Sequence, residues 1–216
     1  MPSWYKLSKI YVGQDQVRPS MRHKSFDFRT MSLADLTAAW FIYQWFNGAS
    51  VGIDSTKWVY ATADGQAVLG YPVDLSTASS LLLKTTFYWF SWSWCGWPRH
   101  WISTSLQESE WNTNFKVACY LNFATNSWYR YQSIYVWWSY KARTDLWNIA
   151  TGEYECTLNI NFTTWLITWN MWLTTLTYTM TSAEIAAART SSYINLVSNY
   201  NWGKQMQMWS AEWEIQ

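Results

Sequence analysis

The stretch Glu153–Phe162 reads Glu-Tyr-Glu-Cys-Thr-Leu-Asn-Ile-Asn-Phe and carries the clearest structural signal in the chain. Every second residue from Tyr154 onward is apolar, whereas the residues between them are Glu, Thr or Asn. An extended backbone points successive side chains to opposite faces, so the pattern predicts a β-strand with one apolar and one polar face. A helix would scatter the same apolar side chains around its axis. The strand therefore needs a second sheet against which to pack.

Similar patterns predict that most of the chain is made of short strands. The run 81–90 is almost entirely apolar or Thr, as expected for a central strand, and Asp64-Gly65 is typical of a hairpin turn between the strands 58–62 and 66–70. The closing strand 211–215 is expected to lie beside an early strand at 25–29. The remaining predicted strands are 101–107, 115–123, 129–136, 167–171 and 175–180, with a short one at 8–12.

Two short helices interrupt the strands. Ser32 and Asp35 form a capping-box pattern that opens a helix ending near Ala39, and Thr181 and Glu184 form a second one ahead of the helix formers 185–189. The chain has no alternation of strands with long helices and no long repeat. The predicted fold is therefore all-β: a two-sheet antiparallel β-sandwich of the jelly-roll type, with one or two short helices.

Composition narrows the range of functions. The chain has 216 residues, a net charge of +1 and only 13% charged residues, so it lacks the basic surface that nucleic-acid binding requires, and a neutral ligand fits better. We see no signal peptide and no apolar run long enough to span a membrane, so we expect no membrane insertion. The three cysteines, Cys95, Cys119 and Cys156, are widely spaced and indicate neither a disulfide framework nor a zinc site. Cys119 and Cys156 fall at inward strand positions, where a thiol packs as a small apolar group.

Tryptophan is unusually abundant. The chain has 20 Trp and 8 Gly, although Gly normally makes up roughly 7% of a protein. Several Trp residues stand where a turn favours Gly: the segment 91–98, Trp202 beside Gly203, and Trp137-Trp138 at the end of a predicted strand. One hypothesis is that many of these codons are UGA, read as glycine in the source organism or phage. The alternative is a truly tryptophan-rich protein.

Residues 23–216 resemble the concanavalin A-like lectin/glucanase superfamily in its laminin-G-like form. The resemblance rests on Phe26-Asp27-Phe28 in the opening strand, Gly152-Glu153-Tyr154 at the entry to the long strand, the helix 182–189, and the closing segment 212–215. It implies a jelly roll that binds carbohydrate on its concave sheet or on the loops at the rim. Some members of the superfamily hydrolyse glycans.

Residues 1–22 form a predicted leader ahead of the domain. Lys9-Ile10-Tyr11-Val12-Gly13 and Val17-Arg18-Pro19 resemble the N-terminal leaders of some phage tail and virion-associated proteins. Pro19 cannot extend a strand ladder, so we expect the leader to end there. The resemblance implies attachment or self-association through this segment, and a location on a virion or cell surface.

The sequence does not support catalysis. Hydrolases of the superfamily carry Glu-x-Asp-x-Glu on one strand, and no such triplet exists here. We interpret the three closest pairs as solvated strand faces. These pairs are Glu108 with Glu110, Glu153 with Glu155, and Glu212 with Glu214.

Neither a catalytic cysteine nor a cofactor is indicated. Cys95 and His100 lie close in sequence, but no third group is available to orient the histidine. Asp54, Asp145 and Asn148 are too scattered to predict a calcium site, and we expect no metal and no cofactor.

A candidate ligand site lies near the strand 129–136. Sugars stack on aromatic rings and bind to Arg and Tyr side chains by hydrogen bonds, so a platform is predicted in this region. The alternative is that its tyrosines pack in the core between the sheets. We predict a non-catalytic, glycan-binding domain, with a structural sandwich that mediates protein contacts as the alternative and a glycoside hydrolase third. The predicted site residues are Tyr129, Arg130, Tyr131, Trp138 and Arg143.

Overall fold

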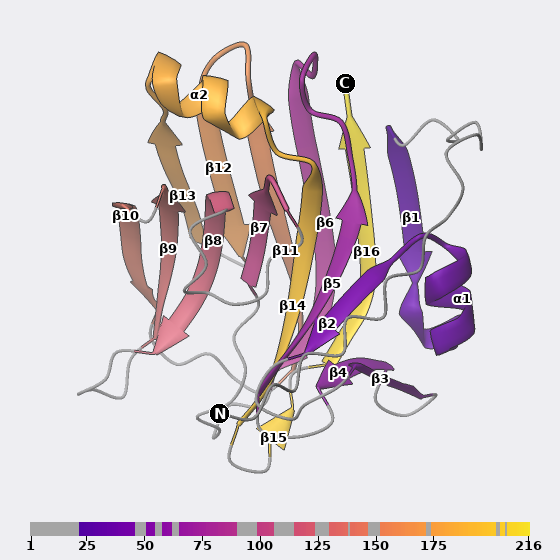
Figure 1. Cartoon of the computed structure of the whole chain (residues 1–216). Helices are drawn as coiled ribbons and strands as arrows, with labels where there is room; N and C mark the ends of the chain where they lie inside the picture. Colours follow the sequence, from indigo (N-terminus) through magenta and orange to yellow (C-terminus); the bar gives the residue numbers. More distant parts are fainter. Residues whose placement is uncertain are drawn as a thin grey trace, which may run out of the picture.

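The protein is a sandwich of two antiparallel sheets (Figure 1). The computed structural model describes residues 22–45, 51–54, 58–61, 65–89, 99–105, 115–123, 130–137, 139–146, 152–171, 174–201, 204–205 and 207–216. The first, sheet A, contains in spatial order β13 (Thr174–Thr179), β12 (Leu166–Met171), β11 (Gly152–Asn161), β6 (Ser80–Trp89), β16 (Gln207–Ile215), β4 (Trp58–Ala61) and β3 (Val51–Asp54), with β1 (His23–Asp27) paired to β16. The second, sheet B, contains β10 (Ser139–Leu146), β9 (Arg130–Val136), β8 (Phe115–Phe123), β7 (Arg99–Ser103), β14 (Tyr193–Asn201), β5 (Gly65–Pro72) and β2 (Ile42–Trp45), with β15 (Lys204–Gln205) paired to β14.

The predicted central strand is confirmed as β11. It pairs with β6 on one side and β12 on the other, and Leu158 lies opposite both Leu83 and Trp169. Its alternate residues are buried while their neighbours reach solvent, because one pleat face meets the opposite sheet. The buried residues are Tyr154, Cys156, Leu158, Ile160 and, just beyond the strand, Phe162.

Both predicted capping boxes are present. Helix α1 (Leu33–Ala38) begins after Ser32, whose hydroxyl accepts a hydrogen bond from the Asp35 amide. Helix α2 (Ser182–Arg189) begins in the same way with Thr181 and Glu184, and it lies across one end of the sandwich (Figure 1). Within the described residues no helix is long and apolar enough to span a membrane.

The closing strand also lies where the sequence predicts. β16 pairs with β1 in antiparallel register, with Phe26 opposite Ala211. The Phe26 and Trp213 rings are 5.2 Å apart in an aromatic cluster that includes Phe41 and Tyr71. The strand predicted at 25–29 begins and ends two residues earlier, at His23–Asp27, because Phe28–Thr30 form a 3₁₀ turn that Asp27 caps through the Arg29 amide.

The predicted Asp64-Gly65 hairpin is wrong. β4 belongs to sheet A, where it pairs with β3 and β16, whereas β5 belongs to sheet B, where it pairs with β14 and β2. The chain therefore crosses from one sheet to the other at this point. A turn-forming dipeptide permits a reversal of direction, but pairing with other strands decides in which sheet the next strand lies.

Buried polar side chains connect the two sheets through the core. Thr85 of β6 and Nε2 of His100 in β7 are 2.6 Å apart, and the Gln132 amide of β9 donates to the Trp169 carbonyl of β12 at 2.8 Å. Cys119 and Cys156 are fully buried free thiols on facing sheets, as the sequence predicts. Burial raises the pKa of both thiols well above the usual value, so they stay protonated and pack as apolar groups.

Candidate functional site

The strands β9 and β10 place a row of polar and aromatic side chains on the outer face of sheet B, the face turned away from the core. Gln132, Ile134 and Val136 of β9 point into the sandwich and are buried. The intervening residues must point outward, because successive side chains of a strand alternate. Cross-strand pairing sets Tyr131 opposite Asp145, Ser133 opposite Arg143, and Tyr135 opposite Tyr140. We call these six residues the outer platform, of which Ser133 is fully buried.

An arginine stacked on a tyrosine is the centre of the outer platform. The guanidinium carbon of Arg143 lies 4.1 Å from the centre of the Tyr131 ring, within the range of a cation–π contact. Nε of Arg143 donates a hydrogen bond to Oδ1 of Asp145 at 2.7 Å, and Nη2 lies 2.7 Å from the same oxygen, so the ion pair holds the guanidinium in place. The two opposite charges offset each other, so this part of the surface is polar but close to neutral.

Two further tyrosines extend the outer platform toward the turn between the strands. The Tyr135 and Tyr140 rings meet edge to face at 5.6 Å, and Tyr140 is 48% exposed. Burial raises the pKa of Tyr135, and the neighbouring Tyr131 and Tyr140 raise it further. Burial also raises the pKa of Tyr140, although Arg143 opposes that change. Both hydroxyl groups therefore stay protonated near neutral pH and can donate as well as accept hydrogen bonds.

The structure brings together two of the five predicted site residues, Tyr131 and Arg143. Tyr131 does not pack between the sheets, so the alternative of a core role is wrong for this residue. Arg130 begins β9 opposite Leu146, but its side chain lies outside the described part, as do Tyr129 and Trp138. Sequence reasoning did not select Asp145, Ser133, Tyr135 or Tyr140. The alternation of Tyr131, Ser133 and Tyr135 was the available signal for the β9 members.

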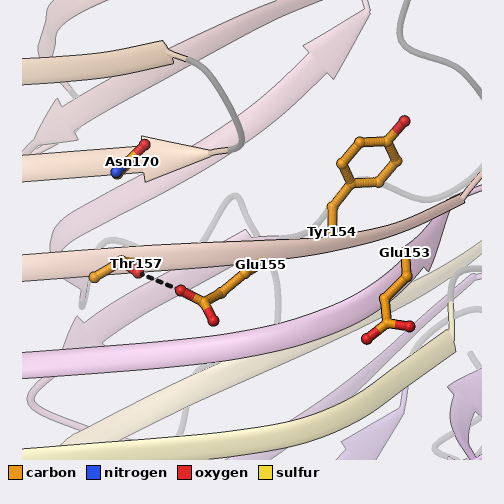
Figure 2. A pocket seen from close by; sticks show the side chains of 5 residues that line it. All are labelled: Glu153, Tyr154, Glu155, Thr157 and Asn170. Atoms are coloured by element: carbon orange, nitrogen blue, oxygen red, sulfur yellow. Dashed lines mark hydrogen bonds between the residues drawn. The ribbon is translucent and has the colours of Figure 1, made fainter.

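The outer face of sheet A carries a second feature, a shallow depression of about 190 Å³ over β11 and β12. Figure 2 shows Glu153 and Glu155 on the same strand, with Thr157 and Asn170 further along the depression. The hydroxyl of Thr157 donates to Glu155 at 3.4 Å. Both glutamates are exposed, as expected for a solvated strand face.

The other predicted carboxylate pairs also fail to form a catalytic arrangement in the described residues. Glu212 contacts His23 at 3.3 Å and Glu214 accepts from the Gln216 amide at 3.0 Å, so each has its own partner. Glu108 and Glu110 lie outside the described residues. Across the described ranges, no group of three or more His, Cys, Asp or Glu side chains could hold a metal ion.

His100 is a core residue. Only 1% of it is exposed, and its ring meets the Trp169 ring edge to face at 5.6 Å. Cys95, the other member of the sequence pair, lies outside the described part. The contact between His100 and Thr85 stabilises the pairing of the two sheets.

We expect Thr85→Val to lower the free energy of unfolding by about 1–3 kcal/mol, because it removes the hydroxyl partner of a buried imidazole nitrogen while keeping the side-chain shape. Urea unfolding of the full chain measures the loss. Thr86→Val is the matched control, since Thr86 is the next residue of β6 and lies on the outer face, partly exposed. Equal stability of the two variants would contradict a role for the Thr85 hydroxyl.

Comparisons with known proteins agree on the fold. No family model and no curated protein sequence matches the chain. Among solved structures, the potassium-bound carbohydrate recognition domain of Emp46p has a TM-score of 0.65 at 10% identity and covers 87% of this chain and 94% of its own. Lectin UEA-II complexed with galactose has a TM-score of 0.65 at 10% identity, with coverages of 92% and 100%. The exoplasmic/lumenal domain of VIP36 in its Ca²⁺/Man-bound form has a TM-score of 0.58 at 11% identity, with coverages of 81% and 82%. The chain thus has the jelly-roll sandwich of these lectin domains.

Proposed function

We propose that the chain is a non-catalytic carbohydrate-binding domain and that the outer platform is its glycan site. The observation that carries the proposal is the stack of Arg143 on Tyr131 with Asp145 beside it. Sugars present apolar C–H faces to aromatic rings and hydroxyl groups to Arg, Asp and Tyr, and the outer platform offers both. The likeness in fold to three carbohydrate-binding proteins supports the same class of ligand.

The chemistry of the outer platform favours a neutral sugar. In the described part of the chain, Asp145 uses Oδ1 for Arg143, which leaves Oδ2 to accept a hydrogen bond from a sugar hydroxyl. The charge of Arg143 is offset by Asp145, so an acidic sugar gains little from binding here. The protonated hydroxyl groups of Tyr135 and Tyr140 add neutral donors.

The proposal includes a location. Residues 1–22 would act as the attachment segment of a domain at 23–216, displayed on a phage tail, virion or cell surface. The sequence resemblance implies the laminin-G-like form of the fold for this domain. The support is the sequence pattern of the leader and the match of known lumenal or extracellular lectin domains to the rest of the chain.

A glycan array probed with the full chain tests the function. We expect selective binding to neutral glycans, and Tyr131→Ala should weaken it about 10- to 30-fold in calorimetric titration with a glycan found on the array, because the stacking ring is lost. Tyr88→Ala is the matched control. Tyr88 stacks on Trp209 on the outer face of sheet A, so its loss should leave affinity unchanged.

Three outcomes would contradict the proposal. A blank array together with self-association in sedimentation would favour a structural sandwich that mediates protein contacts. Selective binding that Tyr131→Ala and Arg143→Ala both leave intact would place the glycan site elsewhere on the domain. Release of reducing sugar from a bound glycan would show a hydrolase.

A further inference from the structure

Three tryptophans have a backbone conformation that belongs to glycine. Within the described residues, the non-glycine residues with positive φ are Trp40 at 74°, Trp137 at 49° and Trp165 at 67°. A side chain in this left-handed region brings Cβ too close to the following carbonyl oxygen, so mainly Gly, and less often Asn or Asp, is found there. Finding Trp at all three positions is unexpected, and each position has a local geometry that calls for Gly.

Trp40 stands at the end of α1 in a Schellman motif. The amide of Phe41 donates to the Leu36 carbonyl at 3.0 Å, and the amide of Trp40 donates to the Thr37 carbonyl at 3.1 Å. Leu36 and Phe41 are both buried, which completes the apolar contact that accompanies this motif. The left-handed residue of the motif is usually Gly, and here it is Trp40.

Trp137 begins a two-residue hairpin turn. Val136 of β9 pairs with Ser139 of β10, which leaves only Trp137 and Trp138 to connect the strands. Two-residue turns need positive φ at the first central residue, because only the mirror-image turn types match the twist of the strands. Gly, Asn and Asp supply that conformation, whereas Trp137 holds it with a bulky side chain that is 43% exposed.

Trp165 ends the turn between β11 and β12. Asn161 pairs with Leu166, and its side chain accepts hydrogen bonds from the Thr163 and Thr164 amides. The residue that returns the chain to the second strand then takes the left-handed conformation, a position that favours Gly. Trp165 is 44% exposed.

We infer that the natural polypeptide carries glycine at positions 40, 137 and 165, and that the codons there are UGA read as glycine by the source's own translation machinery. The 20 Trp and 8 Gly of the chain agree with this inference. Trp169 and Trp213 form the contrast, because they lie in strands, point into the core and are fully buried. We expect tryptophan at these two positions because of this burial, although neither indole Nε1 has a hydrogen-bond partner within the described residues. The inference stands independently of the proposed function.

The inference leaves the six residues of the outer platform unchanged, because Trp137 is not one of them. A glycine at 137 removes an exposed indole beside Tyr135 and Tyr140, the pair nearest the turn. A bound sugar would then stack on the tyrosine rings of the outer platform and not on a side chain of the turn.

The coding sequence and the natural protein give the first test. We expect UGA codons at positions 40, 137 and 165, UGG codons at 169 and 213, and glycine at the first three positions in peptides of the natural protein analysed by mass spectrometry. UGG codons at 40, 137 and 165, or tryptophan in the peptides, would overturn the inference.

Paired variants of the full chain give the second test. At each of the three positions a Gly variant is compared with an Ala variant. Both substitutions remove the indole, but only Gly removes the backbone strain of a residue with a Cβ at positive φ. We expect Trp137→Gly and Trp165→Gly to melt about 2–4 °C above Trp137→Ala and Trp165→Ala, and the same order for Trp40. At Trp213 the order should reverse, because Gly weakens a strand. If the Gly variants at positions 137 and 165 melt below the Ala variants, the inference that glycine is the natural residue there is contradicted. If none of the variants folds, the codons at these positions give the answer.

Discussion

Leu158→Ala is expected to lower the free energy of unfolding by about 3–5 kcal/mol. Leu158 is fully buried in the middle of β11, between Leu83 of β6 and Trp169 of β12. Removing three carbons loses their transfer free energy and leaves a cavity, because strands paired on both sides cannot close over it. For a chain of this size the melting temperature should fall by about 6–20 °C, measured by circular dichroism or calorimetry.

Thr157→Ala is the matched control for this experiment. Thr157 is the adjacent residue of β11 and lies on the outer face of sheet A, with only a long contact to Glu155. Its replacement should change the free energy of unfolding by about 0.5 kcal/mol or less. If both variants lose a similar amount of unfolding free energy, the two faces of β11 do not differ in burial. That result would contradict a sandwich in which one face of β11 packs against the other sheet.

Several elements of the fold could be predicted from the sequence because their causes are local, although the strands β2, β3, β10 and β14 were not predicted. The alternation through β11 follows from the two-residue period of a strand, and the capping boxes at Ser32 and Thr181 satisfy amides within one helical turn. The assignment of strands to sheets could not be predicted in the same way. Asp64-Gly65 shows the reason: a turn signal does not say which distant strands will pair with those on either side of it.

The candidate site could be predicted only in part, for a similar reason. Tyr131 and Arg143 stand out as residue types that bind sugars, and their sequence neighbourhood suggests one platform. Tyr140 becomes a member through the register that the two-residue turn after Val136 sets, whereas Asp145 becomes one only because the register shifts by one residue between Tyr140 and Ala142. The sequence also left open whether Tyr131 points into the core, because either face of β9 contains residues that can be buried.

Glu184→Ala should produce a second large loss, about 3–5 kcal/mol of unfolding free energy at about pH 7. Glu184 is only 5% exposed and joins three elements. Its carboxylate lies 2.9 Å from Nζ of Lys141 on β10, and it accepts hydrogen bonds from the Tyr178 hydroxyl of β13 at 3.0 Å and from the Thr181 amide at 2.8 Å. The substitution leaves these donors without their shared acceptor. Chemical denaturation of the full chain measures the loss.

The dependence of the unfolding free energy on pH distinguishes the contribution of the Glu184 charge from that of its capping hydrogen bonds. Burial, the largest single influence, raises the pKa of Glu184, but the hydrogen bonds from Thr181, Lys141 and Tyr178 together outweigh it and hold the pKa below the usual 4.5. A carboxylate with a lowered pKa in the folded state stabilises the protein above its unfolded-state pKa, and this contribution is lost as pH falls through the folded-state value.

Glu184→Gln removes the charge and one of the two acceptor oxygens, while the remaining oxygen can still complete the capping box. The difference in unfolding free energy between this variant and the parent should be largest near neutral pH and should narrow as the pH falls through the lowered folded-state pKa of Glu184. Asp35→Asn is the second comparison, because Asp35 caps α1 in the same way but is exposed. This substitution should lower the free energy of unfolding much less than Glu184→Gln does. A gap between Glu184→Gln and the parent that stays constant from neutral to acid pH would show that the ion pair with Lys141 adds nothing. The anchoring of α2 to sheets A and B would then rest on its cap and its apolar contacts alone.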